Sequence, residues 1–116
     1  MECALDVSSA SALALPCLDL SKRDMSELPE MEGCEHLRCL YLEGNRLSQL
    51  PPSLFSSCPH LQWLDLRNNR LTHLPQFIQR FRDLKTLLLQ GNRLTALPTQ
   101  LGEHIPASVL IWKQTL

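Results

Sequence analysis

Leucine recurs along the chain at spacings that fit no single helix or strand. In "LQWLDLRNNRLTHLP", residues 61–75, leucine stands at positions 61, 64, 66, 71 and 74. The gaps match neither the 3.6-residue period of an amphipathic helix nor a sustained period of two. The pattern therefore argues against one long helix or a plain hairpin and favours an internal repeat.

The same spacing returns along most of the chain, in units of 22 to 24 residues and a final partial one. The units cover residues 15–36, 37–60, 61–83, 84–106 and, in part, 107–116. The first unit is degenerate, with Arg23 where the others have asparagine and Met25 where they have leucine. Residues 1–14 precede the repeats, and we interpret them as an N-terminal leader or cap.

Three consecutive units, "LRCLYLEGNRLSQLPPSL", "LQWLDLRNNRLTHLPQFI" and "LKTLLLQGNRLTALPTQL", carry a recognisable motif. They resemble the leucine-rich repeat in its LxxLxLxxNxLxxLPxxL form, and the resemblance extends over roughly residues 15–116. It implies an α/β leucine-rich-repeat solenoid, with a short curved parallel sheet and an irregular or short helical convex side. It also implies an intracellular, scaffold- or adaptor-like module that binds a protein, without naming that protein.

Each repeat is expected to contribute one strand and one return segment. In "LxxLxL" the leucines point into the core and the residues between them face outward, because successive side chains alternate across a strand. The proline of "LPxxL" disfavours a second strand and lets the chain turn back. Asn45, Asn69 and Asn92 follow the strands, and we expect each amide to bond the backbone of its own turn and of the neighbouring coil.

Composition narrows the class of partner. The net charge is −1 and the pI about 6.4, so no basic face favours nucleic acid as a partner.

No apolar stretch is long enough to span a bilayer, and the chain is predicted to be soluble. The segment "ALDVSSASALALPC" follows Glu2 and lacks the basic start of a signal peptide. Five scattered cysteines form no disulfide framework, which favours an intracellular, cytoplasmic location.

The outward strand positions supply the candidate binding residues. Tyrosine, tryptophan and arginine contribute most to interface energies, and Trp63 is the leading candidate. The predicted partner-binding set is Arg38, Tyr41, Glu43, Trp63, Asp65, Arg67, Lys85 and Leu88. Some of these side chains can instead pair with one another, for example Asp65 with Arg67 or Arg38. Two weaker candidates are Asp19 and the arginine column that follows the asparagines.

Catalytic and metal-binding alternatives have little support. "CEHLRC" and "CPH" gather Cys34, His36, Cys39, Cys58 and His60, but their spacing is not that of a four-ligand zinc site. No catalytic or phosphate-binding motif occurs. We therefore predict a non-enzyme without cofactor, metal or membrane partner.

The C-terminal end leaves two interpretations open. "SVLIW" predicts a last strand, and Trp112 falls on a core position where its large side chain would close the end of the solenoid. The principal prediction is then an adaptor or regulatory subunit that binds through its concave face. The alternative is a truncated or partial product with a mainly structural role, which associates with itself through an open sheet edge.

Overall fold

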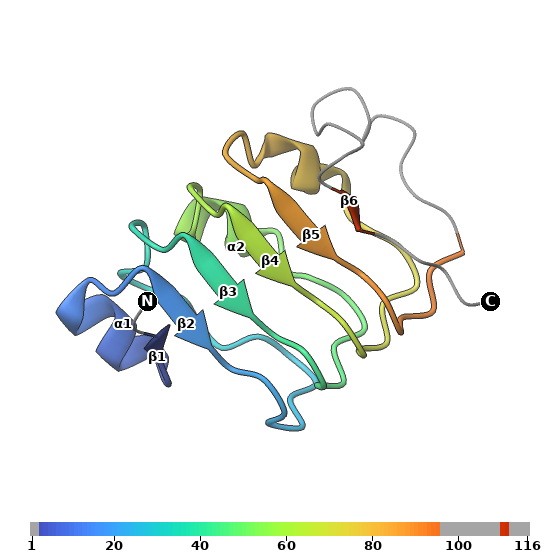
Figure 1. Cartoon of the computed structure of the whole chain (residues 1–116), viewed down its shortest axis with the longest axis horizontal. Coiled ribbons are helices and arrows are strands. Elements are labelled where there is room, and N and C mark those ends of the chain that lie inside the picture. Colours follow the sequence, from blue (N-terminus) through green and yellow to red (C-terminus); the bar gives the residue numbers. More distant parts are fainter. Residues whose placement is uncertain (1–2, 96–109, 112–116) are drawn as a thin grey trace.

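The computed structural model describes residues 3–95 and 110–111. Six short parallel strands form one sheet in chain order, and within residues 3–95 a return segment joins each strand to the next (Figure 1). The strands are β1 (Cys3–Ala4), β2 (Cys17–Asp19), β3 (Cys39–Tyr41), β4 (Trp63–Asp65), β5 (Thr86–Leu88) and β6 (Leu110–Ile111). The helices are α1 (Val7–Leu13), α2 (Ser53–Ser57) and the 3-10 helix η1 (Gln76–Arg80).

The leucine pattern gives the strands a common register. Leu18, Leu40, Leu64 and Leu87 stand side by side in adjacent strands, and all four are fully buried. The other leucines that were predicted to face inward are buried as well, namely Leu37, Leu42, Leu61, Leu66, Leu84 and Leu89. The predicted inward orientation of these leucines is therefore confirmed.

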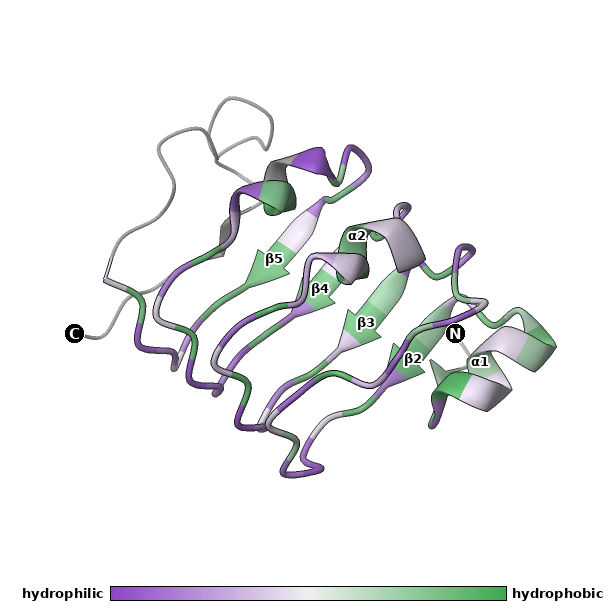
Figure 2. Cartoon of the chain, turned by 180° about the vertical axis from the view of Figure 1, so that it is seen from behind, coloured by the Kyte–Doolittle hydropathy of each residue, from purple (hydrophilic) through white to green (hydrophobic). Residues whose placement is uncertain are grey.

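The return segments form the opposite side of the molecule. α2 and η1 lie behind the sheet (Figure 2), and they bury Leu54 and Ile78 against it. Phe81 joins the two segments, with ring centroids 5.2 Å from Phe55 and 6.3 Å from Phe77. The return segment between β2 and β3 has no helix, so the predicted convex side, irregular or with short helices, is confirmed.

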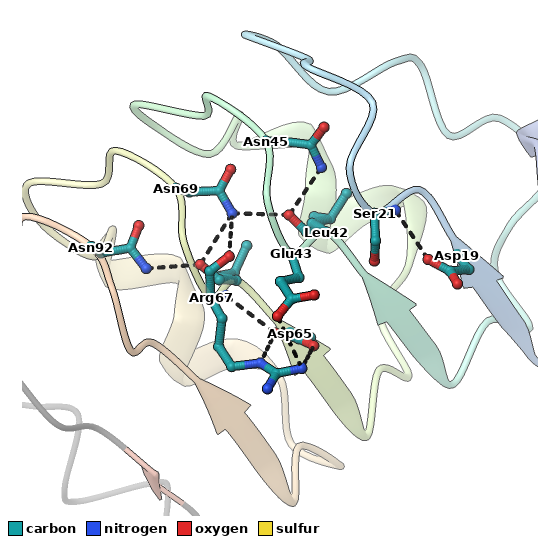
Figure 3. A network of polar contacts seen from close by, with 10 residues as sticks. Asp19, Ser21, Leu42, Glu43, Asn45, Asp65, Arg67, Asn69 and Asn92 are labelled. Carbon is teal, nitrogen blue, oxygen red and sulfur yellow. Dashed lines mark hydrogen bonds and ion pairs between the residues drawn. The ribbon is translucent and has the colours of Figure 1, made fainter.

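The three asparagines form a buried ladder between coils (Figure 3). Asn69 donates from Nδ2 to the carbonyl oxygens of Leu66 in its own turn (3.1 Å) and Leu42 in the preceding coil (2.9 Å). Its Oδ1 accepts from the backbone amide of Leu47 at 3.1 Å. Asn45 and Asn92 bond in the same way. The predicted structural role of these residues is confirmed.

The N-terminal segment contains more structure than the sequence pattern indicated. β1 adds a strand beside β2, and α1 follows it, with Asp6 accepting a hydrogen bond from the Ser9 amide at 2.7 Å at the helix start. Arg23, at the asparagine position of the degenerate repeat, donates to the carbonyl oxygens of Leu5 and Asp19. Arginine thus replaces part of the missing asparagine ladder, while the capping role of residues 1–14 remains a prediction.

The C-terminal end is described only at β6. Leu110 and Ile111 pair in parallel with Leu87 and Leu88, which agrees with the predicted last strand. The prediction that Trp112 closes the solenoid falls outside the described residues, as do the end of the 84–106 repeat and most of the partial one. Among the described segments, no helix has both the length and the apolar character that crossing a bilayer requires.

Candidate partner-binding surface

The outward-facing side of the sheet, called the sheet face below, carries side chains from three rows that cross the strands. We define it by its third, fifth and seventh repeat positions. Across β2 to β5 these rows are Cys17, Cys39, Trp63 and Thr86; then Asp19, Tyr41, Asp65 and Leu88; then Ser21, Glu43, Arg67 and Gln90. No described helix covers this face (Figure 1).

Two aromatic rings mark the centre of the sheet face. Trp63 on β4 is 37% exposed, although it is one of the largest apolar side chains in the chain. Tyr41 on β3 is half-buried beside it, with the ring centroids 6.5 Å apart and the planes tilted by 47°. Burial raises the pKa of the Tyr41 hydroxyl, which therefore stays neutral and able to donate a hydrogen bond. The pair combines apolar area with a polar group.

Asp65 and Arg67 form a bidentate ion pair on β4 and the turn after it (Figure 3). Arg67 donates from Nε to Asp65 Oδ1 at 2.9 Å and from Nη2 to Oδ2 at 2.8 Å, and its Nη2 lies 3.6 Å from Glu43 Oε2. The hydrogen bonds that Arg67 donates to Asp65 raise the pKa of the Arg67 guanidinium. Asp65 is only 2% exposed, so its carboxylate positions Arg67 and presents almost no surface itself.

A shallow hollow of about 450 Å³ lies on the N-terminal half of the sheet face. Its walls come from four successive layers: Leu5, Asp19, Ser21, Lys22, Arg23, Tyr41, Glu43, Trp63, Asp65 and Arg67. Five of the eight predicted residues are therefore brought together there. The other three do not line it: Arg38 and Lys85 are exposed elsewhere, and Leu88 is only 8% exposed.

The chain is similar to known proteins both in sequence and in fold. The profile of the leucine-rich repeat family matches residues 35–94, just over half of the chain. The chain belongs to the leucine-rich repeat family. A solved structure of the Leptospira interrogans leucine-rich-repeat protein LIC12759 matches with a TM-score of 0.62 and 26% sequence identity, over 89% of this chain and 33% of that one. No curated protein matches the chain significantly.

The chain thus spans about a third of the length of the Leptospira protein. Leucine-rich-repeat domains are generally protein-interaction modules, because stacked repeats present an extended face of outward side chains. In this leucine-rich-repeat chain the outward side chains of the strands form the sheet face.

The sequence pattern did not place Leu5, Lys22 and Arg23 at this surface. Leu5 is 62% exposed and follows β1, which the leucine spacing did not reveal because the first layer has no LxxLxL motif. Lys22 and Arg23 belong to the degenerate turn, where Lys22 has a φ of 58°. The only available signal was the substitution of the usual asparagine by Arg23.

One expectation about the cysteines needs correction. Cys17 and Cys39 occupy outward positions as predicted, yet Cys17 is fully buried and Cys39 is 8% exposed. Their strands are in register with Cys3, so three small side chains stand in one row across β1 to β3. The pKa of the Cys17 thiol is raised mainly by burial and, to a smaller extent, by hydrogen bonding with Cys39.

The residues considered as metal ligands have other contacts. His36 Nε2 lies 3.0 Å from the carbonyl oxygen of Ala10, and His60 Nδ1 lies 3.2 Å from Asp83 Oδ2. Cys34 and Cys58 are fully buried, and burial raises the pKa of Cys58 to about 12. Over residues 3–95 and 110–111, no three or more His, Cys, Asp or Glu side chains gather in a way that would hold a metal ion.

The arginine column after the asparagines lies along the turns that follow the strands. Arg46 Nε pairs with Asp24 Oδ1 at 2.7 Å, while Arg70 and Arg93 are exposed. An exposed pair such as Arg46 with Asp24 contributes little stability, roughly 0–1 kcal/mol. These arginines are not among the residues that line the hollow.

Proposed function

We propose that this chain binds a protein partner through the sheet face, in an adaptor or regulatory role and without chemistry of its own. The observation that carries the proposal is the exposure of Trp63 on an outward sheet position. Burying a tryptophan in a partner gains much apolar area at small entropic cost, since the side chain has only two rotatable angles.

The polar surroundings of Trp63 support the same proposal. Arg67 is held in place by Asp65 and lies near Glu43, so little side-chain freedom is lost when a partner contacts it. Tyrosine, tryptophan and arginine are the residue types that most often dominate interface energies. One residue of each type, Tyr41, Trp63 and Arg67, lines the hollow.

The eight predicted residues have different proposed roles. Tyr41, Glu43, Trp63 and Arg67 would contact the partner at the centre of the interface. The exposed Arg38 and Lys85 would lie at its rim, where charges affect association rate more than affinity. The buried Asp65 and Leu88 would act indirectly. Asp65 would hold Arg67 in place, and Leu88 would support the sheet.

We propose an intracellular, cytoplasmic location for this activity. All five cysteines are free thiols, and the strands in register place Cys3, Cys17 and Cys39 side by side without a disulfide. Free thiols in such proximity suit a reducing compartment.

The test is affinity capture from cell lysate with quantitative mass spectrometry, using a double variant of the sheet face. Trp63→Ala combined with Arg38→Glu removes the exposed ring and reverses a rim charge. Arg67→Glu is avoided, because it would leave the buried Asp65 carboxylate beside a second negative charge. The matched control, Gln76→Ala with Arg80→Glu, makes one truncation and one charge reversal on η1, behind the sheet (Figure 2).

Circular dichroism melts must first show that both variants are folded. A protein recovered by the wild type and the η1 control, and lost with the sheet-face variant, supports the proposal. Equal recovery with all three chains contradicts it. If nothing is recovered and light scattering shows a concentration-dependent oligomer, self-association through the β6 edge becomes the better explanation.

A further inference from the structure

Two aspartates on the sheet face have the same backbone setting. Asp65 Oδ1 accepts from the backbone amide of Arg67 at 3.1 Å, and Asp19 Oδ1 accepts from the backbone amide of Ser21 at 3.0 Å. Both residues end a strand and occupy the fifth position of their repeat. Their carboxylates are therefore equivalent by repeat position and by local bonding, two coils apart (Figure 3).

The two sites differ in the side chain two residues further on. Beside Asp65 the guanidinium of Arg67 bonds both carboxylate oxygens, and the aspartate is buried. Beside Asp19 the equivalent residue is Ser21, whose short side chain brings no positive charge, and Asp19 remains half-buried within the hollow. The place that a guanidinium fills at one site is open at the other.

The neighbours of the open place suit a cation with a flat, delocalised charge. Tyr41 stands between Asp19 and Asp65 in the strand register, and all three residues line the same hollow. Glu43 lies on the coil next to Ser21, where its carbonyl oxygen accepts from the Lys22 amide at 2.8 Å. The Glu43 carboxylate already lies near one guanidinium, that of Arg67.

We propose that an arginine side chain of the protein partner occupies the open place beside Asp19. Its guanidinium pairs with the Asp19 carboxylate as Arg67 pairs with Asp65, next to the Tyr41 ring and Glu43. A planar guanidinium matches a carboxylate with two parallel hydrogen bonds and packs on aromatic faces, which a lysine ammonium cannot reproduce. The inference rests on the proposed function and specifies the partner chemistry of the same face.

Besides Arg67, two cationic residues line the hollow, Lys22 and Arg23, and within the described part of the chain neither forms a hydrogen bond or ion pair with the Asp19 carboxylate. The Arg23 guanidinium donates to the carbonyl oxygens of Leu5 and Asp19, and not to the Asp19 carboxylate. The Lys22 side chain packs beside Gly44, where an added Cβ would lie 3.0 Å from Lys22 Cγ. An acidic partner that uses Lys22 is the competing interpretation, and the experiment separates the two.

The experiment selects peptides from a random display library on the full chain and measures their affinity for four variants. Asp19→Asn keeps the acceptor for the Ser21 amide and removes the charge. Ser21→Arg supplies an internal guanidinium to the open place. Lys22→Ala tests the acidic alternative, and Trp63→Ala tests the use of the sheet face itself. The selected peptides are also made with each arginine replaced by lysine or by neutral citrulline.

We expect peptides that need Trp63 and contain an essential arginine. Their affinity should fall tenfold or more with Asp19→Asn, with Ser21→Arg and with citrulline, and should not fall with Lys22→Ala. Ser21→Arg should also raise the melting temperature of the free chain, and Ser21→Arg in the Asp19→Asn background should not.

Three results would overturn the inference, in distinguishable ways. Peptides that need Trp63 but bind Asp19→Asn and wild type equally contradict the arginine site and leave the proposed function standing. Acidic peptides lost with Lys22→Ala support the competing interpretation. A selection without any Trp63-dependent peptide contradicts both the proposed function and the inference.

Discussion

Replacing Asn69 by alanine tests how the asparagine ladder holds the coils together. The Asn69 side chain makes four hydrogen bonds, three donated to the carbonyls of Leu42, Leu66 and Arg67 and one accepted from the Leu47 amide. At about 1 kcal/mol for each bond, a simple sum would give a loss of about 4 kcal/mol. The structure indicates a smaller cost, because the three carbonyls are shared.

Each of these carbonyls keeps a second donor. The Leu42 oxygen retains Asn45 Nδ2 at 3.0 Å, the Leu66 oxygen retains Asn92 Nδ2 at 2.7 Å, and the Arg67 oxygen retains the Gly44 amide at 2.9 Å. Only the buried Leu47 amide loses its acceptor. One unsatisfied buried donor costs about 1–3 kcal/mol, which is the expected loss for Asn69→Ala.

Urea unfolding followed by circular dichroism measures this loss, with an unchanged m-value as the condition for comparing midpoints. The control is Asn68→Gly at the next position, which is exposed and has a φ of 58° that glycine adopts freely. We expect the control to stay within about 0.5 kcal/mol of wild type. A loss below about 0.5 kcal/mol for Asn69→Ala would refute the buried-donor argument, and one above about 4 kcal/mol would refute the sharing of carbonyls.

Three further predictions concern the core, a turn and the thiols. Leu64→Ala should lower the free energy of unfolding by about 2–5 kcal/mol in the same assay, because its side chain is fully buried; a smaller loss would show that the layer collapses around the gap. Gly44→Ala should cost about 1–2 kcal/mol, because φ is 73° and the new Cβ would crowd the Lys22 side chain; an unchanged midpoint would contradict the turn geometry. Burial raises the pKa of Cys58 to about 12, so only about one thiol in ten thousand is ionised near pH 8. Iodoacetamide should therefore alkylate half-buried Cys3 well before Cys58 in the native chain, and peptide mass spectrometry would show the reverse order if Cys58 were accessible.

The repeat pattern predicted the layers because each leucine position of the motif corresponds to a buried position of the structure. Leu61, Leu64 and Leu66 lie on one strand and the residues beside it and are fully buried, and the next repeat has the same local arrangement. The asparagine role followed equally from position, since Asn69 stands where the chain leaves the strand and its backbone groups need new partners. Family membership and fold class were therefore predictable.

The candidate site was predictable only in part, because its shape depends on neighbours in different coils. Trp63 and Tyr41 were identified from type and register alone. The pairing of Asp65 with Arg67 was predictable as an alternative, but the accompanying burial of Asp65 was not. Leu5 could not be placed, because β1 is held by pairing with β2 and its own sequence has no repeat motif.

The most direct test of the central claim is a nuclear magnetic resonance titration of the isotope-labelled chain with the partner recovered by capture. The reporter is the indole N–H of Trp63, assigned by its loss in Trp63→Phe. Binding through the sheet face predicts that this signal and the amides of β3 and β4 shift on addition of the partner, while those of η1 stay in place. Shifts confined to η1 and α2, with the Trp63 indole unmoved, would show that the partner binds the other side and would contradict the account.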